Sequence, residues 1–292
     1  MDALSHALIA YILFSAPGLS QLIPFAILGA VIIDADIFFS SISEKIPSLY
    51  LFTHGGITHS IAGAFVVSLL AFVTVILLAA TGIMPTGVSA DAGIYGFAAV
   101  LAGALLHIVI DVTAVPGIPV LAPFSDRKYS LGLLPGPSLL LFIAAFALVL
   151  ETVFSMLTFS SAIELYGMVV VVFITVRTCM FLGVVVQLPG RKFPFMNPLR
   201  WLVLLEDETS YRIRTYTLFR GYSGETVFEK FKNTDFYELA AAAQIPEVRR
   251  FLFFSYLVTA ERNGHVLILA DPLRENGIMH YPAKYKWIEV KV

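Results

Sequence analysis

Basic side chains are scarce in most of this chain. Residues 1–187 contain only four of the 19 Lys and Arg residues. The single cysteine, Cys179, excludes an intrachain disulfide, and the formal net charge of −2 gives no indication of nucleic-acid binding. Because 58% of the 292 residues are hydrophobic, a long stretch with so few charges predicts a membrane protein.

Charge divides the chain into two parts. The last 105 residues hold the other 15 Lys and Arg residues and 12 of the 21 Asp and Glu residues. The sequence therefore predicts an all-α polytopic membrane domain over 1–188, a linker at 189–198, and a small α+β cytoplasmic domain over 199–292.

Five runs are long enough to cross a bilayer, which takes about 20 apolar residues as a helix. They lie at roughly 22–40, 57–81, 93–113, 137–158 and 162–187. A shorter run at 3–15 is either a short span or a half-buried helix, so we expect five to six transmembrane helices.

The distribution of Lys and Arg predicts the orientation. With six passes, the loops at 16–21, 82–92 and 159–161 share one side and contain no Lys or Arg. Lys45, Arg127 and the basic C-terminal domain lie on the other side. By the positive-inside rule that side is cytoplasmic, which places both termini there in a multi-pass protein of the cell membrane.

Seven ionisable residues lie at the ends of runs that share this predicted cytoplasmic side. They are His6, Asp34, Asp36, His54, His59, His107 and Asp111. Ionisable groups near a bilayer are costly and usually mark a site. Histidine with carboxylate is a ligand set for a divalent metal, so we predict that all seven bind or surround one.

The spacing of the aspartates supports this interpretation. His107 and Asp111 are four residues apart, so both face one side of a helix; the alternative is a buried His–Asp hydrogen bond that locks two helices. Asp34 and Asp36 do not share a helix face. We expect the helix to end or unwind there, so that both carboxylates turn toward one centre, unless they form a solvated helix end.

His54 and His59 bracket a glycine-permitted turn into a helix. Thr58 or Ser60 would cap that helix or hydrogen-bond a bound oxyanion. Arg127, in a loop on the same predicted side, would hold a phosphate or carboxylate of a substrate. Its alternative role is an anchor beside lipid headgroups.

These motifs resemble the YdjM/YbcI-type family of membrane-bound metal-dependent hydrolases over roughly residues 1–135. The family pattern is an early histidine, a Pro-Asp-x-Asp element, His-Arg-Gly-x-Thr-His-Ser, then His-x-x-x-Asp before a Pro-Phe loop. The matching residues are His6, Asp34, Asp36, His54, Thr58, His59, Ser60, His107, Asp111, Gly117, Pro123 and Phe124. Ile33 replaces the usual proline, and Gly55 replaces the usual arginine. If that arginine binds substrate in the family, we expect either an altered substrate or activity here, or Arg127 in its place.

The sequence therefore predicts hydrolysis of a lipid-associated ester or phosphoester, with membrane lipids as partners. One or two divalent ions would activate water, and one of Asp34, Asp36 and Asp111 would be free to act as general base. Zinc suits the histidines, with manganese or iron as alternatives. Seven groups exceed the needs of one catalytic zinc, which favours several ions or additional residues that orient the ligands.

Two other classes of function compete with a hydrolase. The first is a metal-ion transporter or metal-sensing membrane protein, although transporters place their polar groups near the bilayer midplane rather than at one face. The second is a scaffold with a closed structural metal.

The C-terminal domain gives no indication of its role. Strands are expected at 200–206, 211–219 and 225–231, a helix over 235–256 interrupted at Pro246, two strands around Asn263-Gly264, and a last strand over 285–292. The domain would cover the metal site, bind a partner or stabilise a dimer.

Overall fold

The computed structural model describes residues 2–82, 93–136, 138–280 and 284–292. The predicted loop at 82–92 lies almost wholly outside these residues. The chain forms two compact units, one of residues 1–40 with 52–183 and the other of residues 41–51 with 184–292.

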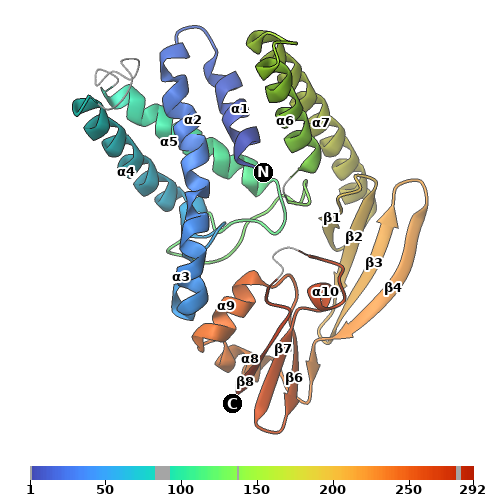
Figure 1. The fold of residues 1–292 in the computed structure, drawn as a ribbon. Helices are drawn as coiled ribbons and strands as arrows, with labels where there is room; N and C mark the ends of the chain where they lie inside the picture. The colour runs from blue at the N-terminus through green and yellow to red at the C-terminus, as the bar shows by residue number, and fades with distance from the viewer. Residues whose placement is uncertain (1, 83–92, 137, 281–283) are drawn as a thin grey trace. The chain divides into compact units, whose positions relative to one another are not determined.

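The first unit is helical (Figure 1). Its α-helices are α1 (Ala3–Phe14), α2 (Ile23–Ile32), α4 (Ile61–Ala80), α5 (Gly93–Val112), α6 (Leu139–Val153) and α7 (Phe159–Gln187), whose last residues belong to the second unit. Short 3₁₀ turns η1 (Ser20–Leu22), η2 (Ile33–Phe39) and η4 (Ile57–His59) lie between them.

Among the residues that the structure describes, four helical segments are long and apolar enough to span a membrane: Ser20–Lys45, Ile61–Ala80, Gly93–Val112 and Phe159–Gln187. Helices α1 and α6 have 12 and 15 residues. At 1.5 Å per residue they cover about 18 and 22 Å, less than the roughly 30 Å of a hydrocarbon core. A membrane domain with four candidate spans is therefore supported, and the predicted count of five to six is not confirmed.

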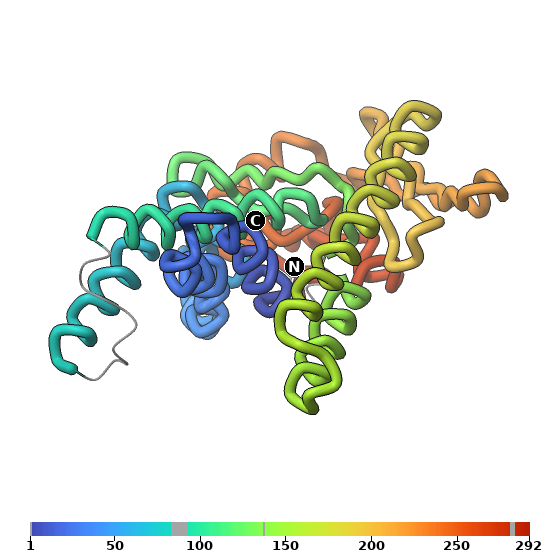
Figure 2. The backbone as a smooth tube through the Cα atoms, turned by 90° about the horizontal axis from the view of Figure 1, so that it is seen from above, coloured from blue at the N-terminus to red at the C-terminus, as the bar shows by residue number. Residues whose placement is uncertain are grey.

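Helices α2 and α5 cross with their backbones in contact. A Cβ atom built on Gly29 would lie 1.8 Å from the carbonyl oxygen of Val100, and one on Gly103 would lie 2.0 Å from that of Ala26. Only glycine permits so close an approach, as at other small-residue helix crossings. Helix α1 lies between α2 and α6, as Figures 1 and 2 show, which brings the start of the chain into the bundle.

The second unit is rich in β-sheet. Strands β1 (Arg191–Pro194), β2 (Arg200–Glu206), β3 (Ser210–Thr217) and β4 (Gly221–Glu229) form an antiparallel sheet in that order. In the other sheet, β5 (Phe231–Lys232) pairs parallel with β6 (Thr259–Asn263), and β7 (Val266–Ala270) and β8 (Trp287–Lys291) follow antiparallel. Helices α8 (Phe236–Ala242), α9 (Pro246–Phe254) and α10 (Pro272–Glu275) complete the fold.

The predicted hairpin at Asn263-Gly264 joins β6 to β7. Asn263 pairs with Val266, and Gly264 has a φ of +64°, which glycine adopts without strain. The alternating inward residues Leu267 and Leu269 pack with Val248 and Phe251 of α9 in the core of this unit. The alternation of hydrophobic residues and the glycine turn therefore both specify the β6–β7 hairpin.

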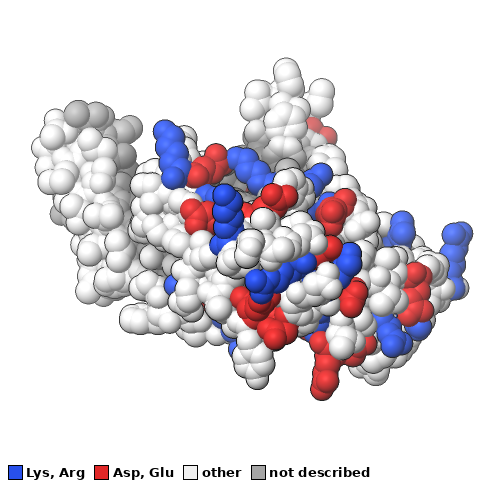
Figure 3. Space-filling model, turned by 90° about the horizontal axis from the view of Figure 1, so that it is seen from below, with Lys and Arg blue, Asp and Glu red and all other residues white. Residues whose placement is uncertain are grey.

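Basic and acidic side chains are interspersed on the face drawn in Figure 3. Ion pairs of the second unit include Arg214 with Glu225 at 2.9 Å and Lys230 with Glu206 at 2.7 Å. Residues 41–51, which contain most of α3 (Ser40–Lys45) and all of η3 (Pro47–Leu49), also belong to this unit.

Candidate metal centre

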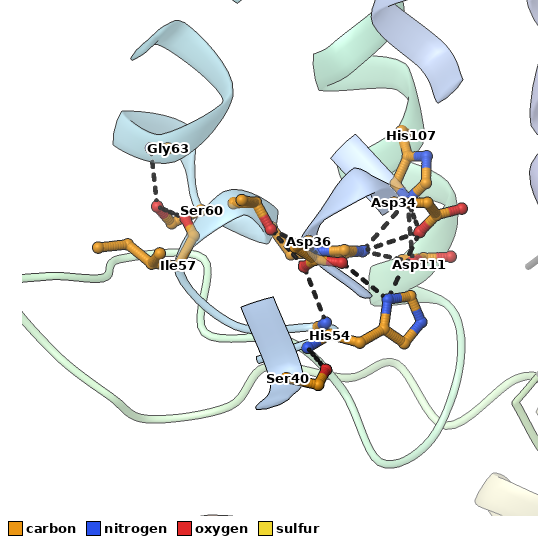
Figure 4. A network of polar contacts seen from close by, with 12 residues as sticks. Asp34, Asp36, Ser40, His54, Ile57, Ser60, Gly63, His107 and Asp111 are labelled. Carbon is orange, nitrogen blue, oxygen red and sulfur yellow. Dashed lines mark hydrogen bonds and ion pairs between the residues drawn. The ribbon is translucent and has the colours of Figure 1, made fainter. Parts of the chain in front are cut away.

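All seven histidine and aspartate residues singled out in the sequence lie together in the first unit. They form three overlapping groups, in each of which the possible ligand atoms lie within 4.8 Å of one another: His6, His107 and Asp111; Asp34, His59 and His107; Asp36, His54 and His59. Figure 4 shows the side chains of Asp34, His107 and Asp111 converging. Their placement agrees with the sequence, and their roles as ligands stay predictions.

The glycine crossing of α2 and α5 sets one side of the site. It brings the carbonyl oxygen of Ala30 to 2.7 Å from Nδ1 of His107. His107 is fully buried. Its Nδ1–H donates to this carbonyl, which leaves Nε2 as the nitrogen with a lone pair for a ligand.

The two aspartates of η2 lie where α2 ends. The chain changes to a 3₁₀ helix at Ile33, as the spacing of the acids predicted. Asp34 Oδ1 then lies 3.5 Å from Nε2 of His59, and Asp36 Oδ2 lies 3.0 Å from Nδ1 of the same ring. The two carboxylates therefore face the two nitrogens of one buried imidazole.

Four atoms have the separations expected around one cation: Asp34 Oδ1, His59 Nε2, His107 Nε2 and Asp111 Oδ2. Five of their six pairwise distances are 3.3–3.5 Å. Tetrahedral zinc with bonds of about 2.1 Å would hold its ligand atoms roughly 3.4 Å apart. The distances are longer than those of ordinary N–H···O hydrogen bonds.

Unsatisfied polar atoms test the fit of a metal independently. Oδ1 of Asp34 and both ring nitrogens of His6 are buried without a hydrogen-bond partner among the described residues. His6 Nε2 lies 3.3 Å from Asp111 Oδ1, and its ring stacks on His107 with centroids 3.7 Å apart. A buried group without a partner is costly, and a cation bound by Asp34 Oδ1 would relieve that cost for this oxygen. The residues therefore fit a divalent metal.

Asp36 connects three parts of the site. It faces Nδ1 of His54 at 2.9 Å, and it accepts from the backbone N–H of Gly55 at 3.2 Å and from the hydroxyl of Thr58. Through its contact with His59 it forms the carboxylate–histidine pair that commonly orients a metal ligand.

Gly55, one of the two positions that depart from the family pattern, has a defined conformation. Gly55 has a φ of +72°, and a Cβ atom there would meet nothing within 4 Å. The first side-chain atom of an arginine would have room, but the residue would need a left-handed backbone.

The carboxylates also set the charge of His59, which lies before α4 and outside the four apolar segments. Burial lowers the pKa of His59, but hydrogen bonding to Asp34 and Asp36 outweighs burial and raises it to about 9. A cation that binds this imidazole must displace the proton, since metal ligands bind deprotonated.

The three residues predicted to bind substrate have different surroundings. Thr58 is buried in the cluster and lies 3.1 Å from Nδ1 of His59. Ser60 caps α4, because its hydroxyl accepts from the N–H of Gly63 at 2.9 Å. Arg127 is exposed, with its guanidinium 5.6 Å from the ring centre of Tyr129. Contact with substrate stays a prediction for all three.

Two contributors to the site were missed in the sequence. The carbonyl of Ala30 is a backbone group, which no residue type announces. Ser40 accepts from the backbone N–H of His54 at 3.4 Å, a contact across 14 residues. The glycines at the α2–α5 crossing were the available signal, because glycines within apolar helices often mark close packing.

Comparison with known proteins bears on the first unit. The profile of the YdjM inner membrane protein family matches residues 1–186. No curated protein and no solved structure matches the chain. The matched segment includes every residue of the candidate metal centre and covers more than half of the chain, and the resemblance drawn from the histidine and aspartate motifs is confirmed. The chain belongs to the YdjM inner membrane protein family.

Proposed function

We propose that the protein is a membrane-bound metal-dependent hydrolase that cleaves a lipid-associated ester or phosphoester at the cytoplasmic face. The observation that carries the proposal is the set of overlapping groups that each offer three His or Asp ligands. Catalytic zinc sites use three protein ligands and keep one position open for water or substrate.

The residues of the candidate metal centre would have different roles. Asp34, His59 and His107, one of the three-ligand groups, would supply the ligands, and Asp36 and the Ala30 carbonyl would hold the outer nitrogens of the two imidazoles. A divalent cation held there, zinc or else manganese or iron, would acidify water and stabilise negative charge during attack on the ester.

Asp111 and His6 are suited to moving the proton. Asp111 presents Oδ2 toward His59 and His107, and Oδ1 toward Nε2 of His6 at 3.3 Å. A carboxylate–imidazole pair of this kind can accept a proton from attacking water and return it to the leaving oxygen.

Solvent reaches the site from the carboxylate side. The side chains of Asp34 and Asp111 are 19% and 14% exposed, whereas those of His59 and His107 are 1% and 0% exposed. The cluster also lies at the ends of apolar helices, where a lipid headgroup would meet it. Arg127, exposed on a neighbouring loop, would bind the phosphate or carboxylate of such a substrate.

One observation favours a second candidate, a structural metal. Oxygen or nitrogen atoms of Asp34, His59, His107 and Asp111, with five of their six separations at 3.3–3.5 Å, would close a tetrahedral zinc site without an open position. Water-proton relaxation of the manganese-loaded protein separates the candidates, because only an open site exchanges water rapidly on the ion.

Metal content and hydrolysis test the proposal together. Elemental mass spectrometry of detergent-purified wild type should find at least one ion per chain, which His107→Ala should lose. The exposed His265→Ala is the matched control and should keep the metal. Metal-dependent cleavage of p-nitrophenyl phosphate, p-nitrophenyl esters or micellar phospholipid should follow the same order. A wild type that binds no metal, even from added zinc or manganese, overturns the proposal.

A further inference from the structure

The chain leaves the first unit between two residues of the candidate metal centre. Residues up to Ser40 belong to the first unit, residues 41–51 belong to the second, and the chain returns to the first unit at Phe52. Asp36 lies five residues before this excursion of residues 41–51, and His54 lies shortly after it. The excursion therefore connects the metal centre covalently to the β-sheet-rich unit.

Polar contacts hold the first half of the excursion within the second unit. The guanidinium of Arg250, on α9, donates through Nη1 to the carbonyl oxygens of Ser43 at 3.0 Å and Glu44 at 3.1 Å. These carbonyls lie in the last turn of α3, where helix carbonyls lack intrahelical partners and a cation is favoured. Glu44 also forms an ion pair with Lys284.

Aromatic packing holds the second half. Tyr50 is 5% exposed and forms a buried cluster with Phe253 and Phe254. Its ring centroid lies 5.2 Å from that of Phe253, and the guanidinium of Arg249 lies 5.8 Å from the centre of the Tyr50 ring. Both halves of the excursion are thus fixed to α9 and its surroundings.

In the first unit, hydrogen bonds join the residues that stand just before and just after residues 41–51. His54 faces Asp36 through Nδ1 at 2.9 Å, and its backbone N–H donates to the hydroxyl of Ser40 at 3.4 Å. Asp36 in turn faces Nδ1 of His59 at 3.0 Å. A displacement of residues 41–51 would therefore change the orientation of His59 through the Asp36–His54 pair.

We infer that the second unit serves to position the metal centre, and that Arg250 is its principal positioning residue. By holding residues 41–51, Arg250 fixes where Asp36 and His54 stand and hence how His59 presents Nε2. This inference rests on the proposed metal site and gives the C-terminal part of the chain a role in that site.

Metal affinity of the full chain is the direct test. Zinc competition against a chromophoric chelator should show Arg250→Ala binding about threefold to tenfold more weakly than wild type, less than the 10–100-fold typical when a ligand's direct partner is lost. Arg262→Ala is the matched control, because it removes an arginine that pairs with Glu238 in the same unit. The control should bind zinc as wild type does.

A conservative variant protects the test against simple misfolding. Arg250→Lys keeps a cation beside the carbonyl oxygens of Ser43 and Glu44 and should restore much of the zinc binding lost in Arg250→Ala. Wild-type zinc affinity in Arg250→Ala, or equal weakening in Arg250→Ala and Arg250→Lys, would overturn the inference while leaving the metal site intact. Absence of metal from wild type would instead remove the proposed function itself.

Discussion

The histidine and aspartate cluster of the first unit and the surface ion pairs of the second unit differ sharply in burial. In the first unit, Asp36, His59 and His107 are almost completely buried and gathered without a Lys or Arg among them. In the second, pairs such as Arg214–Glu225 lie at the surface, each side chain more than a third exposed. Exposed pairs contribute little because water competes for both partners, whereas buried groups impose a large cost unless something compensates them. We interpret the contrast as that between a site and a surface.

The largest effect is expected where the first unit has no space. Gly103→Ala would place a methyl carbon 2.0 Å from the Ala26 carbonyl oxygen, which would force α2 and α5 apart and separate His107 from Ala30. Destabilisation should reach about 3 kcal/mol, the upper range for overpacking, with loss of metal. Gly183→Ala on α7 meets nothing within 4 Å and should not lower the thermal midpoint. Equal midpoints for the two variants would contradict the close crossing.

Removal of the metal should have the second-largest effect, and this effect should be confined to the first unit. An ion present at 100 times its Kd stabilises the folded state by about 2.7 kcal/mol. Stripping with a chelator should therefore lower the thermal midpoint, and hydrogen exchange should speed up in η2 and at the end of α5 but not in β6 and β7. Equal loss of protection in all of these elements would show that the metal does not act locally.

A smaller effect is expected from Asp36→Asn. The amide keeps the shape of the carboxylate but loses the charge that faces His54 and His59. Metal affinity should fall 10–100-fold, as for other partners of ligating histidines. Glu225→Gln makes the same chemical change at the surface and should leave the affinity unchanged. Calorimetric titration with zinc would measure both variants.

The smallest effect is expected from the exposed pair itself. Arg214→Ala should change stability by no more than about 1 kcal/mol, and less at high salt, since both partners are solvated and screened. Thermal midpoints at low and high salt would measure this. A larger loss of stability would mean that water and salt do not screen this pair as its exposure predicts. The contrast between the units would then weaken.

Much of this arrangement was predictable from local patterns. The i,i+4 spacing of His107 and Asp111, the glycine turn after His54, and the scarcity of Lys and Arg before residue 188 predicted a helical membrane unit with clustered His and Asp side chains. The Asn263-Gly264 hairpin and the strands around it followed from turn chemistry and alternation. The number of spans did not follow, because α1 and α6 proved shorter than a bilayer crossing requires.

What the sequence determined by itself was therefore chemistry and periodicity: which residues can bind a cation, which stretches are helical and apolar, and which are strands. Only the tertiary structure decided that Ala30 and Asp36 orient the two imidazoles, and that residues 41–51 belong to the second unit. The physical reason is that these are long-range contacts of backbone carbonyls, close helix crossings and packed aromatic rings. Their energies depend on where distant segments meet, and no local spacing encodes that.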